Sequence, residues 1–274
     1  MAFAQLSKVR LEYFPHGAGP EKIVFIHGFQ ASARIWQPTQ HALPSDLYAS
    51  IAVNNRGAGG SEAPPRESDF SVPHFSDDAF ELVSQLGWRD FTMVGHSLGG
   101  STAAQFAVDH PTLLKGVVML DPAGPDGPAP PAGLSVDDMV DRMMAARQAR
   151  AARGEAGDGI DASGAGASGE LMRALAADMA AASERRLRGS ARSMFEMRLG
   201  DRLKALTLPM LLAAGDADEL IPLASMLAAL AKYPPGTGLH VWHGVGHSPN
   251  LDCPGDLAAV LRRFIEVTIP ARRK

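Results

Sequence analysis

The chain has 274 residues, of which 46% are hydrophobic and 20% charged, and a formal net charge of −4. This length suits one large domain or two small ones, and the slight negative charge excludes the basic excess of a nucleic-acid-binding protein. A single cysteine excludes an internal disulfide. With no apolar run near the ~20 residues that span a bilayer and no secretory signal pattern, we expect a cytoplasmic protein with no membrane partner.

Short apolar runs rich in strand-forming residues recur along the chain. Alternation of Leu6, Val9, Leu11 and Tyr13 with polar neighbours predicts an edge strand near the start. Most later runs are continuous, which is typical of strands buried on both faces of a parallel sheet. These runs cover residues 22–27, 48–54, 91–95, 116–121, 208–215 and 239–242.

Helical periodicity lies between these runs. In Val72–Leu86 the apolar residues fall on one helical face, Ser71 can cap the first turn, and Gly87 ends the segment. Further helices are predicted at residues 97–109, 221–232 and 255–267. Strands that alternate with helices predict an α/β fold, with a mostly parallel central sheet and helices on both faces.

The segment 125–205 interrupts this alternation. Around its start, "PAGPDGPAPPAG" contains too much proline and glycine for a helix or a central strand. Helices are predicted at 135–153 and 169–188, and the intervening "GEAGDGIDASGAGASG" is predicted to be a mobile surface loop. We therefore expect a core of residues 1–124 and 206–274 with a helical insertion at 125–205.

A serine between glycines stands where a predicted strand ends and a predicted helix begins. Gly95, Ser97 and Gly99 fit the pattern G-x-S-x-G, which is typical of a sharp strand–turn–helix that exposes a nucleophile. Such a turn leaves no room for side chains two residues before and after the serine. Because a serine hydroxyl is a poor nucleophile alone, it needs a general base, and the base needs an orienting acid.

Candidates for the base and the acid follow later strands. The stretches "AAGDADELIP" and "WHGVGHSPNLDCP" each include the end of an apolar run, and ligands bind at the carboxyl ends of parallel strands. We assign Asp218 as the acid and His247 as the base, in the chain order Ser, Asp, His. Asp216 and Asp121 are the alternatives for the acid.

Backbone N–H groups near the serine are expected to form an oxyanion hole. The N–H of Leu98 follows the nucleophile, and the N–H of Phe29 follows a His-Gly pair at the end of another strand. Such a donor contributes ~3 kcal/mol in favourable cases. His27 is predicted to brace its loop by hydrogen bonds, and His96 is predicted to pack away from the reacting groups.

Three histidines close together in the sequence raise the question of a metal site. His240 and His243 lie three residues apart in a predicted strand and would face opposite sides of it, and no cysteine or carboxylate completes a ligand set with the three histidines. We therefore expect no metal, and the proposed chemistry needs no cofactor.

Methionine is concentrated in the insertion. Its flexible, polarizable side chain fills irregular apolar gaps and suits adaptable surfaces. Met139, Met143 and Met194 are the candidates for lining a substrate pocket, the alternative being that they pack against the core.

These motifs together resemble the α/β-hydrolase superfamily over residues 9–124 and 206–268. The resemblance rests, in order, on HGF, NNRGAGGS, GHSLGG, GDADELIP and GHSPNLDCP. It implies a serine esterase or lactonase in which the insertion acts as a lid. Asn55 departs from the pattern, because relatives usually have aspartate there, and this affects the packing of its loop rather than the chemistry.

The sequence thus predicts a serine hydrolase for a small-molecule ester or lactone with a medium to large apolar or aromatic group. A serine nucleophile argues against the dehalogenases and epoxide hydrolases of the superfamily, which use aspartate there. A carbon–carbon bond hydrolase of ring-cleavage products is an alternative, although relatives of that kind usually have HGxGPG where this chain has HGFQAS. A binding protein that senses a small molecule, with slow turnover, is the alternative outside the enzymes.

Overall fold

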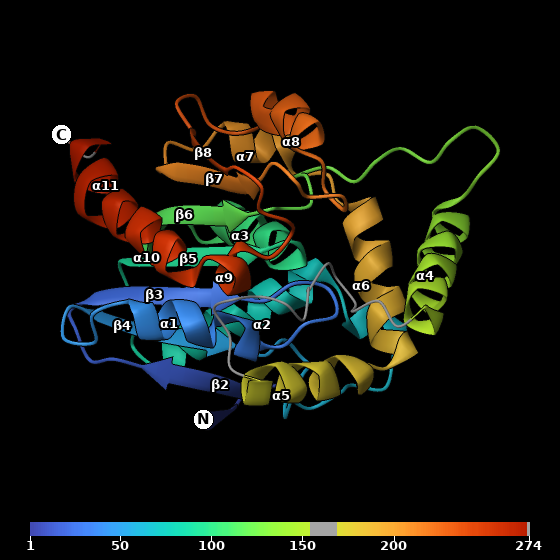
Figure 1. Ribbon diagram of the computed structural model, residues 1–274, viewed down its shortest axis with the longest axis horizontal. Helices are drawn as coiled ribbons and strands as arrows, with labels where there is room; N and C mark the ends of the chain where they lie inside the picture. Colours follow the sequence, from blue (N-terminus) through green and yellow to red (C-terminus); the bar gives the residue numbers. More distant parts are fainter. Residues whose placement is uncertain (154–168, 273–274) are drawn as a thin grey trace.

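The computed structural model describes residues 1–153 and 169–272, and an eight-stranded sheet lies at its centre (Figure 1). The strand order is β1-β2-β4-β3-β5-β6-β7-β8. β2 is antiparallel to β1 and to β4, and every other neighbouring pair is parallel. The strands are β1 Ala2–Gln5, β2 Arg10–His16, β3 Glu21–Ile26, β4 Tyr48–Val53, β5 Phe91–His96, β6 Leu114–Leu120, β7 Met210–Gly215 and β8 Gly238–Trp242.

This architecture confirms the predicted fold class, with one difference at the start of the chain. The alternating segment there was predicted to be one edge strand, but it forms the second half of a two-stranded hairpin. The N–H of Leu6 donates to the carbonyl of Val9 at 2.9 Å and closes the turn between the strands. This turn contains no Gly or Pro, the residues that usually indicate a turn in a sequence.

Helices cover both faces of the sheet. α2 and α3 lie on one face, and α1 and α10 lie on the other (Figure 1). No helix in the described ranges is long and apolar enough to cross a membrane. The helices of the core are α1 Gln37–Ala42, α2 Val72–Gln85, α3 Leu98–Asp109, α8 Leu223–Ala229, α9 Pro249–Asp252, α10 Pro254–Arg263 and α11 Ile269–Arg272. Shorter segments are the 3-10 turns η1 Ala33–Trp36, η2 Glu67–Asp69, η3 Pro111–Leu113 and η5 Leu230–Lys232, and the π-helical η6 Phe264–Thr268.

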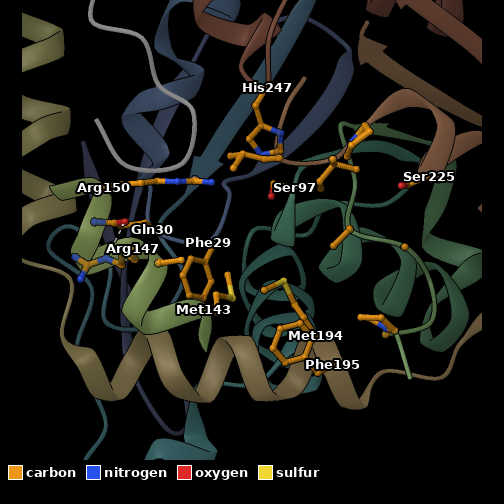
Figure 2. A pocket seen from close by; sticks show the side chains of 18 of the residues that line it. Phe29, Gln30, Ser97, Met143, Arg147, Arg150, Met194, Phe195, Ser225 and His247 are labelled. Carbon is orange, nitrogen blue, oxygen red and sulfur yellow. Dashed lines mark hydrogen bonds between the residues drawn. The ribbon is translucent and has the colours of Figure 1, made fainter. Parts of the chain in front are cut away.

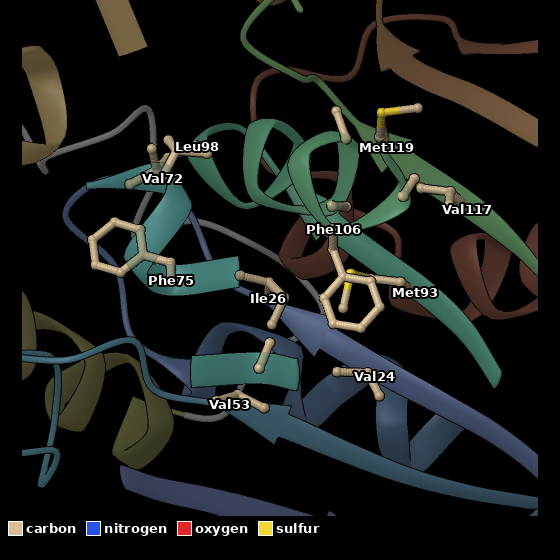
Figure 3. Packing of buried hydrophobic residues seen from close by; sticks show 14 of the residues in the cluster. Val24, Ile26, Val53, Val72, Phe75, Met93, Leu98, Phe106, Val117 and Met119 are labelled. Carbon is tan, nitrogen blue, oxygen red and sulfur yellow. The ribbon is translucent and has the colours of Figure 1, made fainter. Parts of the chain in front are cut away.

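Side chains of the central strands alternate between two apolar clusters. Val24 and Ile26 of β3 belong to the cluster under α2 and α3, which also contains Phe106 (Figure 3). Their neighbours Ile23 and Phe25 belong to the cluster under α10 on the opposite face. The period of two along a strand explains why a continuous apolar run is needed to fill both clusters.

In the described part of the chain between β6 and β7, four helices lie within the predicted insertion. They are α4 Val136–Ala152, α5 Gly169–Ala180, α6 Glu184–Glu196 and α7 Gly200–Lys204. α4 packs against α6, and Figure 1 shows the two beside one end of the sheet. The division of the chain into core and insertion stays a prediction.

One predicted helix of the insertion is wrong. Residues 169–188 form the whole of α5 and the start of α6, because the helix breaks before Ser183. The Ser183 hydroxyl accepts the N–H of Arg186 at 3.2 Å and caps α6. The predicted loop at 154–169 lies outside the described residues except for Gly169, which begins α5.

A buried ion pair joins the loop after β4 to α2. Nη2 and Nε of Arg56 donate to the two carboxylate oxygens of Asp78 at 2.6 and 2.7 Å, and Nη1 donates to the carbonyl of Asp69 at 3.2 Å. The neighbouring Asn55 is buried as well, and its N–H donates to Nε2 of His27 at 3.1 Å. The loop after β4 is therefore attached to α2 through Arg56 and to the loop after β3 through Asn55.

Removal of the Arg56 guanidinium should destabilise the fold strongly, because it leaves the Asp78 carboxylate buried without a partner. We expect Arg56→Met to lower the free energy of unfolding by about 3–5 kcal/mol in urea denaturation. Arg66→Met is the control, since Arg66 is 77% exposed where it pairs with Asp69, and it should cost less than about 1 kcal/mol. Equal losses in the two variants would contradict this role of the buried pair.

Candidate active site

Ser97 occupies the turn between β5 and α3 in a strained backbone conformation. Its φ is +53° and its ψ is −116°, which L-residues rarely adopt. The flanking glycines permit the turn: a Cβ on Gly99 would lie 2.2 Å from the carbonyl oxygen of Ile26, and one on Gly95 would lie 2.0 Å from that of Gly99. The strand–turn–helix expected from the sequence is therefore present, with Ser97 partly exposed at its apex.

His247 and Asp218 form a buried pair beyond the ends of β8 and β7. Nδ1 of His247 donates to Oδ2 of Asp218 at 2.7 Å, and the two side chains are 4% and 0% exposed. The N–H groups of Leu220 and Ile221 donate to the other oxygen, Oδ1, at 2.7 and 2.9 Å. Burial opposes ionisation of Asp218, but the hydrogen bond and charge of His247 and these N–H groups hold its pKa below the ordinary value.

Asp216, the nearest alternative for the acid, pairs with a different histidine. Its carboxylate accepts from Nδ1 of His243 at 2.8 Å and from the N–H of Gly244 at 2.7 Å. The His243 side chain is 99% exposed and lies just beyond the end of β8, not within the strand as predicted. This pair therefore closes a surface loop and does not meet Ser97.

Asp121, the other alternative, lies behind the buried pair. It follows β6 with φ +42°, and its Oδ1 accepts the N–H of Gly215 at 3.1 Å. A carboxylate oxygen of Asp121, a carboxylate oxygen of Asp218 and a ring nitrogen of His247 all lie within 4.8 Å of one another. Contrary to the expectation from the sequence, two carboxylates thus complete a possible set of metal ligands with His247, although Nδ1 of His247 and Oδ2 of Asp218 are already bonded to each other. Burial, reinforced by the charge of Asp218, raises the pKa of Asp121 to about 9, so it is a neutral acid at neutral pH.

A cavity of about 500 Å³ opens over Ser97 and His247, and Figure 2 shows both side chains at its edge. Met143 and Met194 line the cavity, whereas Met139 is not among the described residues that do so. Met139 lies one turn earlier on α4 than Met143, which places it beyond the end of the cavity. Other apolar wall residues are Phe29, Phe195, Leu220 and Ile221.

The two expected oxyanion donors belong to residues near Ser97. Leu98 is the first residue of α3, so its N–H has no acceptor within the helix. Phe29 lines the cavity, and the preceding Gly28 is so close to the turn that a Cβ on it would lie 3.3 Å from the Cβ of Ser97.

Two histidines brace the loops of the site. Nε2 of His96 donates to the carbonyl of His247 at 2.7 Å, and Nδ1 of His27 donates to the carbonyl of Gly28 at 2.7 Å. Burial is the main cause that lowers the pKa of each ring to about 3. The neighbouring charge of His247 lowers the pKa of His96 further, and the charge of Arg186 lowers that of His27. Both rings are therefore neutral. The predicted bracing role of His27 is confirmed. His96 does not pack away from the reacting groups as predicted, because its ring centroid lies 4.8 Å from that of His247 and it supports the loop that carries His247.

Arg186 of α6 is a residue of the site that the sequence did not reveal. Its guanidinium is buried, and Nη2 donates to the carbonyls of Phe29 and Ala31 at 3.1 and 3.0 Å. A guanidinium that bonds two carbonyls of the Phe29 loop limits the freedom of that loop. In the sequence, Arg186 stands in an arginine-rich helix segment with no motif to distinguish it from its neighbours.

Comparison with known proteins places these features in a family. A family model described as alpha/beta hydrolase fold matches residues 22–254. A fluoroacetate dehalogenase from a Burkholderia species is 32% identical over 108 residues, which are 38% of this chain and 35% of that protein. The matches to the first curated relatives cover 32–42% of those proteins' own length.

Solved structures share the fold over nearly the whole chain. An esterase from Exiguobacterium antarcticum superposes with a TM-score of 0.81 at 22% identity, covering 96% of this chain and 98% of that one. The enol-lactonase from Burkholderia xenovorans LB400 superposes with a TM-score of 0.79 at 16% identity, covering 97% of this chain and 100% of that one.

The neutral state of Asp121 predicts how stability depends on pH. Between about pH 4 and pH 9 the folded protein keeps a proton on Asp121 that the unfolded chain has released. Stability then falls with rising pH by up to about 1.4 kcal/mol per unit, and Asp121→Asn removes this contribution. In urea denaturation, the free energy of unfolding of the variant relative to that of the wild type should be higher near pH 8 than near pH 5. If the free energy of unfolding of the variant minus that of the wild type is the same at both pH values, or is lower near pH 8, Asp121 is ionised in the fold.

Proposed function

The chain belongs to the α/β-hydrolase family, and on that premise we propose that it is a serine hydrolase acting on a carboxylic ester or lactone. The observation that carries this proposal is the buried His247–Asp218 hydrogen bond of 2.7 Å, beside a cavity that His247 shares with Ser97. An imidazole that an acid holds by one nitrogen can act as a base through the other. A serine at a glycine-flanked turn is the group that such a base activates.

The first half of the reaction forms an acyl-enzyme. Because Nδ1 of His247 is bonded to Asp218, Nε2 is the atom that accepts the Ser97 proton as Oγ attacks the carbonyl carbon. The N–H groups of Phe29 and Leu98 stabilise the negative charge that develops on the carbonyl oxygen. The protonated His247 then gives its proton to the departing alkoxide, and the alcohol leaves.

The second half releases the acid. His247 removes a proton from water, the resulting hydroxide attacks the acyl carbon, and the proton returns to Oγ as the acid leaves. The Asp218 carboxylate stabilises the imidazolium in both halves and keeps the ring in the required tautomer.

The walls of the cavity support a medium to large apolar or aromatic group in the substrate. Met143 comes from α4 and Met194 and Phe195 come from α6, so helices of the insertion form part of the cavity. We propose that the insertion is a lid, and that its side chains determine which ester or lactone is accepted.

Loss of the Ser97 hydroxyl should abolish covalent chemistry. We expect the wild type to react with a fluorophosphonate probe and to hydrolyse 4-nitrophenyl butanoate, and Ser97→Ala to lose labelling and about 10⁴-fold or more in kcat. Ser84→Ala, an exposed serine on α2, should stay within about threefold of the wild type. Ligand binding without labelling or turnover in the wild type would instead indicate a sensor.

The acid can be identified by comparing the two aspartates of one loop. Asp218→Asn should lower kcat by about 10⁴-fold, because asparagine favours the wrong imidazole tautomer. Asp216→Asn affects only the surface contacts of Asp216 with His243 and with the N–H of Gly244, and it should change kcat by less than about threefold. Both are measured with the same 4-nitrophenyl ester, and a larger effect from Asp216→Asn would overturn the assignment.

A further inference from the structure

Two arginines of α4 line the cavity that contains Ser97. Arg147 and Arg150 lie four and seven residues after Met143, so all three share one helical face. Both arginines are half-buried. A serine hydrolase that acts on apolar esters needs no positive charge in the wall of its cavity. Partial burial of such a charge costs free energy unless a ligand compensates it.

The two guanidinium groups have no acidic partner in the described part of the chain. Nε of Arg147 donates to Oε1 of Gln30 at 3.0 Å, and this acceptor is neutral. Within residues 1–153 and 169–272, the Arg150 guanidinium makes no hydrogen bond or ion pair. Figure 2 shows Arg147 directed toward Gln30, whereas Arg150 extends toward Ser97. Arg150 is therefore the cation that faces the reacting groups.

Carboxylates near the cavity are already engaged elsewhere. Asp126 lines the cavity, but it accepts from Nζ of Lys232 at 2.8 Å and from the N–H of Gly200 at 2.8 Å. Asp218 is bonded to His247. The described residues thus leave an excess of positive charge on the α4 side of the cavity.

We propose that Arg150, assisted by the nearby charge of Arg147, binds a free carboxylate of the substrate. The inference rests on the proposed serine hydrolase function and names its substrate class: esters or lactones that carry a second, unesterified acid group. The planar guanidinium matches a carboxylate through two parallel hydrogen bonds. Apolar walls such as Phe29 and Met143 receive the carbon atoms between the two ends. Water adds across the ester bond, giving an alcohol and a carboxylic acid, while the bound carboxylate is unchanged.

Matched ester pairs test this inference. Mono-4-nitrophenyl adipate is compared with 4-nitrophenyl hexanoate, and 4-acetoxybenzoate with its methyl ester, which places the acid on the acyl or on the alcohol side. The wild type should prefer the acid member of at least one pair by about tenfold in kcat/KM. Arg150→Met should abolish that preference, and Arg150→Lys should keep part of it because the charge remains.

Arg142→Met is the matched control, since Arg142 is an exposed arginine on the same helix outside the cavity lining. It should keep the wild-type preference for the acid ester within about twofold. A wild type without any preference for the acid esters, or a preference that survives Arg150→Met, would overturn the carboxylate site.

A binding measurement separates this inference from the proposed function. Calorimetric titration of the Ser97→Ala protein should show monomethyl adipate binding about tenfold more tightly than dimethyl adipate, and the difference should vanish in Ser97→Ala/Arg150→Met. If neutral esters are hydrolysed but neither kinetics nor binding depends on Arg150, the hydrolase function stands and the carboxylate site is wrong. If no ester is hydrolysed but binding of the half-ester depends on Arg150, the site stands and the hydrolase function is wrong.

Discussion

The backbone can turn at Ser97 only because positions 95 and 99 carry no side chain. Gly99 lies so close to β3 that any Cβ would overlap the carbonyl of Ile26. Holding a non-glycine residue at φ +53° costs about 1–3 kcal/mol, and the surrounding structure offsets it, for example through the bond of 2.9 Å from the Ser97 N–H to the carbonyl of Leu120. The start of α3, the exposure of the Ser97 hydroxyl and the proximity of the Gly28 loop all depend on the close approach of Gly99 to β3.

The electrostatics of the site follow from which buried groups remain neutral. Burial is the main cause that lowers the pKa of His27 and His96 to about 3 and raises that of Asp121 to about 9. Burial opposes ionisation of Asp218 too, but the bonds from His247 and from two N–H groups hold its pKa below the ordinary value, so this carboxylate retains its charge, and His247 lies against it. A localised negative charge beside one imidazole is what a general base needs, because it stabilises the cation that proton transfer creates.

Much of the core could be predicted because its signals are local. A continuous apolar run, a glycine-flanked serine and an acid or histidine just after a strand each appear in adjacent residues. Parallel strands then bring distant loops to one edge, so the contact of Asp218 with His247 follows from topology. The hairpin turn at Leu6 carries no glycine or proline, and it was missed for that reason.

The helices between β6 and β7 were harder to predict because their interactions depend on how they pack together. Nothing in the arginine-rich sequence of α6 indicates that Arg186 turns inward to bond the Phe29 loop. Met139 and Met143 were both candidates for lining the cavity and lie one turn apart on α4, but the extent of the cavity along that helix decides that Met143 alone of the two lines it. The same limit applies to Arg150, whose direction toward Ser97 is evident only in three dimensions (Figure 2).

The central claim is that Ser97 carries the acyl group during turnover. The most direct measurement is rapid acid quenching of the protein with 4-nitrophenyl butanoate, followed by mass spectrometry of its peptides. The mechanism predicts a butanoyl group on the peptide that contains Ser97, appearing with the first burst of nitrophenol and disappearing as substrate is exhausted. Turnover with an acyl group on another residue, or with no acylated peptide even when deacylation is slowed, would contradict it.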